Sequence, residues 1–235
     1  MVDQLIEFLN KSEGRDKLCK TIQYGSRFFK VWSEGNKEVF QMFANLQDSM
    51  ADARKLFRLG KTINDYGALV TLLGQKKPLH KMIFAVLTRV SFMLYWLFDN
   101  LFILSKIKFF TSLDKAKMAL RSAQFWTLAL IFNIIAIFIE FSDIIKEEAD
   151  TRKKVAQASS DQEKREALEK RKALDKKKMD NSLNLLKNLG DIINSSTGAQ
   201  IPAQLGFKFP ETANALGGAL SSSIAMYQVW PAAKK

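Results

Sequence analysis

The stretch FWTLALIFNIIAIFIEFSDII, residues 125–145, decides the fold of this chain. Between residues 125 and 139 only Thr127 and Asn133 are polar. A helix of about 20 such residues crosses the roughly 30 Å hydrocarbon core of a bilayer. Trp126 stands at its start, where an interfacial aromatic side chain is expected. The segment is therefore predicted to be a transmembrane helix, the central anchor of a helical membrane bundle.

The composition around this segment favours helices and excludes several kinds of site. Three of the four prolines in the 235 residues follow Ile201, so most of the chain lacks a helix breaker. Cys19 is the only cysteine and His80 the only histidine, which excludes an intrachain disulfide and a cysteine-based metal site. The sequence holds no glycine-rich phosphate loop and no spaced acid/base pair. We therefore expect no enzyme activity and no catalytic, cofactor or metal site.

The formal net charge of +12 has three usual interpretations: binding to nucleic acid, binding to an anionic membrane, or solvation. The basic residues flank apolar runs, and no module combines base-stacking aromatics with a basic surface. This distribution favours the anionic lipids of a membrane surface and argues against nucleic acid. The first residues contain no basic region followed by a long apolar run, so no secretory signal is expected.

A second apolar stretch, residues 82–104, is long enough to cross a bilayer but contains Arg89 and Asp99. These charges offset the insertion free energy of the apolar residues, so the sequence leaves open whether the segment spans the membrane or lies in its plane. Arg89, Asp99 and Asn100 lie in one third of the helix circumference. Ten residues separate the two charges, about 15 Å along a helix, so each needs a partner outside its own helix.

Residues 1–81 have the pattern of amphipathic helices. In the stretch 37–59 apolar residues recur on one face, and cations border that face. A helix of this kind lies in the headgroup layer with its apolar face in the lipid. The residues predicted to bind the membrane are Arg54, Lys55, Phe57, Arg58 and Lys61. The same pattern fits a core helix with a solvated face, and the sequence alone does not choose between the two.

The C-terminal part begins with the charged run 146–180, predicted to be a solvated loop or helix. Residues 181–235 follow as a short amphipathic helix and an uncharged segment, 213–230. Small residues at every fourth position allow two helices to approach closely in lipid. These predicted helix-packing residues are Ala213, Gly217, Ser221 and Ala225. We expect this segment to form a membrane helix packed against residues 125–145.

Together these segments predict an all-α fold, an integral membrane helical bundle with N-terminal amphipathic helices. Its parts are residues 1–81, the membrane helices within 82–145, the charged run 146–180 and the C-terminal part 181–235. Two crossings, at 125–145 and at 213–230, would place both termini on one side of the membrane and the charged run on the other. A crossing by 82–104 would exchange the sides of the charged run and the C-terminus.

Four blocks of sequence, in order along almost the whole chain, resemble the peroxin-eleven family of peroxisomal membrane proteins. The first contains GRDK at residues 14–17 and QYGSRF at 23–28, and the second is ARKLFRLGK at 53–61. The third is LYWLFDN at 94–100. The fourth joins LLKNLGD at 185–191 to a tail that starts with LGG at 216–218 and ends at Trp230.

The resemblance implies a peroxisomal membrane location and a remodelling function that promotes elongation, proliferation and fission of peroxisomes. Family members insert an amphipathic helix of the N-terminal half into the cytosolic leaflet and self-associate. The family also implies partners: a second copy of the chain, a dynamin-like fission GTPase with its adaptors, and the import receptor for peroxisomal membrane proteins. Two alternatives stay open, a pore for small metabolites lined by the polar face of 82–104, and an adaptor that only recruits the fission machinery.

Overall fold

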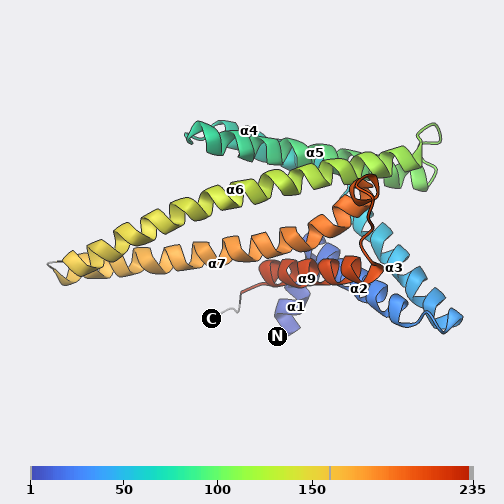
Figure 1. Cartoon of the computed structure of the whole chain (residues 1–235), viewed down its shortest axis with the longest axis horizontal. Helices are drawn as coiled ribbons and strands as arrows, with labels where there is room; N and C mark the ends of the chain where they lie inside the picture. Colours follow the sequence, from blue (N-terminus) through green and yellow to red (C-terminus); the bar gives the residue numbers. More distant parts are fainter. Residues whose placement is uncertain (1, 159, 233–235) are drawn as a thin grey trace.

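The computed structural model describes residues 2–158 and 160–232, which form helices and their connections and contain no strand (Figure 1). The helices are α1 (Val2–Asn10), α2 (Ser12–Trp32), α3 (Lys37–Phe57), α4 (Lys61–Leu73), α5 (Leu79–Lys106), α6 (Lys115–Gln157), α7 (Asp161–Gly198), α8 (Ile201–Gln204) and α9 (Glu211–Val229). The predicted all-α class is confirmed.

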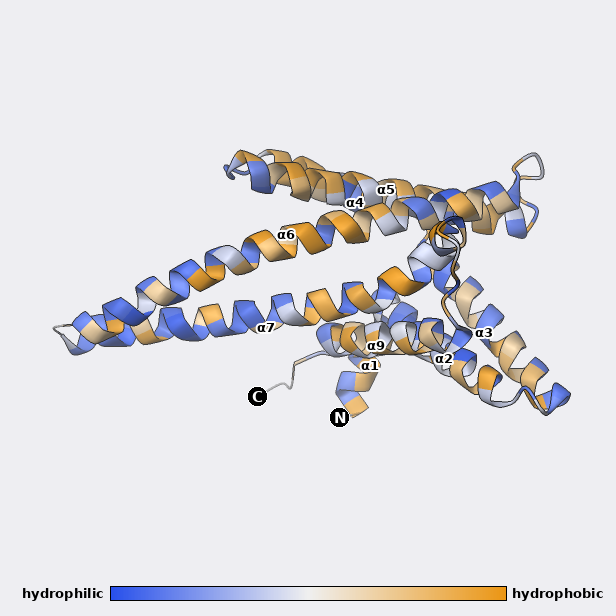
Figure 2. Cartoon of the chain, viewed as in Figure 1, coloured by the Kyte–Doolittle hydropathy of each residue, from blue (hydrophilic) through white to orange (hydrophobic). Residues whose placement is uncertain are grey.

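The helices α5 and α6 form an antiparallel pair, and both are long and apolar enough to cross a membrane. The 43 residues of α6 contain the predicted span 125–145, and α5 covers 82–104 without a break. Figure 2 shows hydrophobic residues gathered in α5 and in the middle of α6. Asp114 caps α6 by accepting hydrogen bonds from the amides of Ala116 and Lys117.

The charged run 146–180 forms the tip of a long helical hairpin, made by the end of α6 and the beginning of α7 (Figures 1 and 2). Ser160 and Glu163 form a capping box at the start of α7. Glu148 pairs with Lys178 across the hairpin, at 3.1 Å between Oε2 and Nζ. The run is therefore helical rather than a loop.

A second unit joins the two ends of the chain. The helices α2 and α3 form a hairpin, and α9 packs on α2 and on α7. The Gln4 side chain donates a hydrogen bond to the Pro231 carbonyl at 3.0 Å, and the Phe8 and Trp230 rings lie 5.1 Å apart. Figure 1 shows the two termini on the same side of the molecule.

The position of α9 corrects one prediction. The sequence pattern favours packing of this helix against residues 125–145 of α6, but its extensive contacts are with α2 and α7. Small residues allow two helices to approach closely, but they do not determine which helix is the partner. Here Gly217 faces Gly190 of α7. Within the described residues only α5 and α6 have the length and hydropathy of membrane spans. Membrane insertion of α9 stays a prediction.

Candidate functional site: a buried ion network beside a basic cavity

Arg58, the residue that ends α3, connects the N-terminal hairpin to α5. Its guanidinium Nη2 lies 2.9 Å from Asp99 Oδ2, and Nη1 donates to the Tyr95 hydroxyl at 3.1 Å. On the other side its Nε lies 3.9 Å from Asp16 Oδ1 of α2. All four side chains are buried. Charges of opposite sign and hydrogen-bond partners are what buried ions require.

Arg54, one turn earlier on α3, completes this arrangement. Its Nε donates to Asp16 Oδ1 at 3.2 Å, and its Nη1 donates to Gln23 Oε1 at 2.6 Å. Burial alone would raise the pKa of Asp16, but Arg54, Arg58 and Lys17 outweigh it and hold that pKa well below its usual range. Asp16 is therefore a fixed negative charge. We call Asp16, Arg54, Arg58, Tyr95 and Asp99 the buried ion network.

Lys20 connects α2 to the other end of the chain. Its Nζ lies 2.8 Å from Asp191 Oδ1 of α7 and 2.5 Å from Ser221 Oγ of α9. Burial lowers the pKa of Lys20 to about 8, against the opposing effect of Asp191. One lysine thus joins α2 to two helices of the C-terminal part, α7 and α9.

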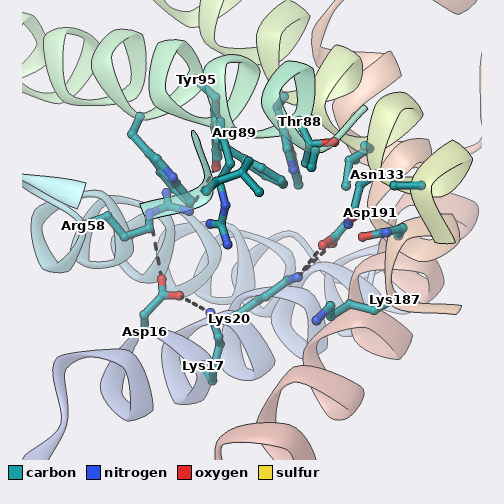
Figure 3. A pocket seen from close by; sticks show the side chains of 18 of the residues that line it. Asp16, Lys17, Lys20, Arg58, Thr88, Arg89, Tyr95, Asn133, Lys187 and Asp191 are labelled. Carbon is teal, nitrogen blue, oxygen red and sulfur yellow. Dashed lines mark hydrogen bonds and ion pairs between the residues drawn. The ribbon is translucent and has the colours of Figure 1, made fainter. Parts of the chain in front are cut away.

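A half-open cavity of about 480 Å³ lies between α2 and α5 and is also lined by α6 and α7 (Figure 3). The ion network forms one part of its wall, and Lys20 with Asp191 forms another. Asp16 and Asp191 are the acidic residues of the wall. The cationic residues of the wall are Lys17, Lys20, Arg54, Arg58, Lys77, Arg89 and Lys187. The cavity is therefore strongly basic.

The predicted membrane-binding residues do not share one exposed surface. Arg54 and Arg58 are 8% and 6% exposed, so in this structure they do not reach lipid headgroups. Lys55 lies over the Phe102 ring at 5.1 Å and Lys61 over the Trp96 ring at 4.7 Å, so both turn towards α5. Phe57 alone is well exposed. The basic border of α3, with Lys61 at the start of α4, thus faces carboxylates and aromatic rings of this chain.

Two of the three predicted intramembrane polar residues, Arg89 and Asp99, find their partners on other helices. Asp99 pairs with Arg58, and Arg89 Nη1 lies 2.8 Å from Asp65 Oδ1 of α4. The side-chain oxygen of Asn100 is buried without a hydrogen-bond partner in the described residues. Arg89 and Asp99 therefore do not pair with each other, as the distance along one helix required.

The predicted helix-packing residues are used within the chain. Gly217 lies against Gly190, and Ser221 accepts the hydrogen bond of Lys20. Ala225 is buried, and Ala213 is half-buried at the start of α9. This face of α9 is therefore covered by α2 and α7 and is not open to a second copy of the chain.

Sequence reasoning missed Asp16, Lys20, Tyr95 and Asp191. A signal for the aspartates was present, because the blocks GRDK, LFDN and LGD each contain one of Asp16, Asp99 and Asp191. The arginines of the network come from the remaining block, ARKLFRLGK. The four blocks that carry the family resemblance thus meet around this site.

These features define a class: an all-helical membrane protein whose N-terminal hairpin is joined by a buried ion pair to α5, one of two candidate spans. Within the described residues no three metal-binding side chains lie together. The chain belongs to the family described as Peroxisomal biogenesis factor 11 (PEX11), because the model of that family matches residues 2–230. It is therefore a peroxisomal membrane protein and a peroxisome biogenesis factor, in a family that is generally non-enzymatic.

Similarity to individual relatives extends over most of the chain. Peroxisomal membrane protein 11 homolog of Dictyostelium discoideum is 26% identical over 98% of this chain and 94% of its own. Peroxisomal membrane protein 11A of Homo sapiens is 25% identical over 97% of this chain and 96% of its own. Peroxisomal membrane protein 11B of Arabidopsis thaliana is 32% identical over 70% of each chain. No solved structure matches the chain significantly.

Proposed function

We propose that this protein remodels the peroxisomal membrane, promoting elongation, proliferation and fission, by inserting amphipathic helices into one leaflet and by self-association. The proposal involves no catalytic step. The observation that carries it is the outer face of α4, a helix that lies along the candidate span α5. Four large side chains on α4 are mostly exposed, Ile63 at 73%, Tyr66 at 58%, Val70 at 52% and Leu73 at 61%.

These four residues follow one another at helical spacing, so they form a stripe along one side of α4. Burial of each such side chain contributes about 1.5–3 kcal/mol. A lipid surface next to α5 would supply that burial. Because α4 lies along α5, the wedge would be α4 together with an α5 that lies in the plane of the membrane, rather than the basic border of α3. Insertion of a helix into one leaflet expands that leaflet and so favours curvature.

The α4 stripe predicts the outcome of a liposome assay. Ile63→Ser with Val70→Ser is expected to abolish tubulation of phosphatidylcholine vesicles that contain anionic lipid, because it removes two of the inserted side chains. Leu168→Ser, which changes an exposed leucine on the charged half of α7, is the matched control. Electron microscopy of the vesicles gives the result. Full tubulation by the double variant would exclude α4 as the wedge. A wild-type protein that leaves liposomes unchanged would favour an adaptor that recruits a dynamin-like GTPase.

A pore for small metabolites is the second candidate, favoured by the cavity because its wall includes Thr88 and Asn133 of the two candidate spans. Against it, the charges of α5 are paired with Arg58 and Asp65. Planar-bilayer recording with the purified protein separates the two functions. We expect no stepwise conductance, and a conductance that changes in Asn133→Leu would establish the pore.

A further inference from the structure

The cationic side chains of the cavity differ in whether they are neutralised. Most of them pair with a carboxylate, as Lys20 does with Asp191 and Arg58 does with Asp99. Lys77 and Lys187 form no ion pair with any residue that the structure describes. Because both line the cavity, its wall has an excess of positive charge that the chain itself does not neutralise.

The surroundings of Lys187 add to this excess. Its Nζ donates to the neutral acceptors Asn184 Oδ1, at 2.9 Å, and Gln228 Oε1, at 2.6 Å. Burial lowers the pKa of Lys187, and the positive charge of Lys17 lowers it further. The charge of Asp191 acts in the opposite direction, and an anion between these lysines would raise that pKa in the same way. Figure 3 shows Lys17, Lys20 and Lys187 close together on one side of the cavity.

Asn188 supplies an independent observation. It follows Lys187 on α7, lines the same cavity and is 3% exposed. Its side-chain nitrogen is buried and has no hydrogen-bond acceptor within the described residues. A buried donor without an acceptor is unfavourable, and buried amide groups almost always have partners. Because that nitrogen is fully buried, it would donate to a group in the cavity once the Asn188 side chain rotates.

We propose that this cavity binds a phosphate group, held by the two lysines that lack a carboxylate partner, Lys187 and, at the edge, Lys77, with Asn188 as a further donor. Lysines act as point charges towards phosphate, and a phosphate has enough oxygen atoms to accept from several directions at once. A volume of about 480 Å³ leaves room for a small group attached to the phosphate, within the range of ligand sites. Two sources share this chemistry, the headgroup of a phosphomonoester lipid and a soluble phosphomonoester. The proposal does not depend on membrane remodelling or on a pore.

The test measures ligand stabilisation of the full-length protein in neutral detergent micelles at low ionic strength. The probes are glycerol 3-phosphate, short-chain phosphatidic acid and, as a neutral control, short-chain phosphatidylcholine. We expect the midpoint of thermal unfolding to rise with a phosphomonoester and not with phosphatidylcholine. A rise with both phosphates identifies a soluble ligand, and a rise with phosphatidic acid alone identifies a lipid headgroup.

Variants decide whether the effect comes from the cavity. Lys187→Gln is expected to weaken the apparent affinity about tenfold or more. The control Lys172→Gln changes an exposed lysine on the same helix and should leave the affinity unchanged. Lys77→Gln changes an exposed residue at the edge of the cavity, so it tests the site even if Lys187→Gln folds poorly. No stabilisation by either phosphate would overturn the proposal, as would an equal loss of affinity in Lys77→Gln, Lys187→Gln and Lys172→Gln.

Discussion

Replacing Arg58 by methionine is expected to destabilise the protein by about 3–5 kcal/mol, because it leaves a buried carboxylate without its partner. Asp99 is buried at the interface with α3, and Arg58 is its ion-pair partner. The same substitution removes the donor to Tyr95 and one of the two arginines beside Asp16. The loss should appear as an earlier unfolding transition in detergent, followed by tryptophan fluorescence.

The loss of stability in Arg58→Met should first affect the contact between the N-terminal hairpin and α5. Helices α3 and α5 share few contacts, and most of the polar ones run through Arg58. Hydrogen exchange of α2 and α3 is therefore expected to accelerate in Arg58→Met, while exchange in the α6–α7 hairpin stays unchanged. Arg152→Met is the matched control, since its pair with Glu148 is on the surface, where ion pairs contribute about 0–1 kcal/mol.

A double variant separates charge from packing. If an unpaired carboxylate causes the loss, Arg58→Met with Asp99→Asn should recover a large part of it, because the amide is neutral. Additive losses in the double variant would show that the Arg58 side chain acts through its packing instead. If Arg58→Met is as stable as the wild type, Arg58 does not stabilise the contact between α3 and α5.

The arrangement of Arg58 also shows what the sequence pattern determines. A helical wheel drawn through residues 37–61 places Arg54, Arg58 and Lys61 beside one apolar face, but the helix ends at Phe57 and Lys61 begins α4. The wheel does not say what lies opposite, and here Asp16 and the rings of α5 occupy the position that the pattern assigns to lipid headgroups. Asp99 must find a partner on another helix because Arg89 lies too far from it along their own helix. Which residue becomes that partner depends on tertiary packing.

The apolar segments are easier to predict than the polar ones. The span at 125–145 depends on composition and length, which are local properties, and it lies within α6. Residues 82–104 stay ambiguous in the sequence because the cost of Arg89 depends on whether it is paired. The structure supplies that pair through Asp65, a residue of α4 that no local pattern singles out.

The contact between α7 and α9 gives the second large effect. Gly190→Ala is expected to destabilise the protein by about 2–3 kcal/mol, because a Cβ atom there would overlap the Gly217 carbonyl oxygen. Backbone cannot move aside as a flexible side chain does, so the two helices would have to separate. Separation would also lengthen the hydrogen bond between Lys20 and Ser221, which depends on the same approach.

A second glycine makes this prediction specific. Gly67 lies in α4, and a Cβ atom added to it would have no neighbour within 4 Å, so Gly67→Ala should stabilise its helix by up to about 1 kcal/mol. The same chemical change is thus expected to have opposite signs at the two positions. Unfolding midpoints of both variants in detergent provide the measurement. Gly217→Ala should behave like Gly190→Ala, since its Cβ would lie 2.7 Å from the Gly190 carbonyl oxygen. Stabilisation by all three substitutions would show that α9 does not pack on α7. It would favour the prediction from the sequence that α9 is a membrane helix.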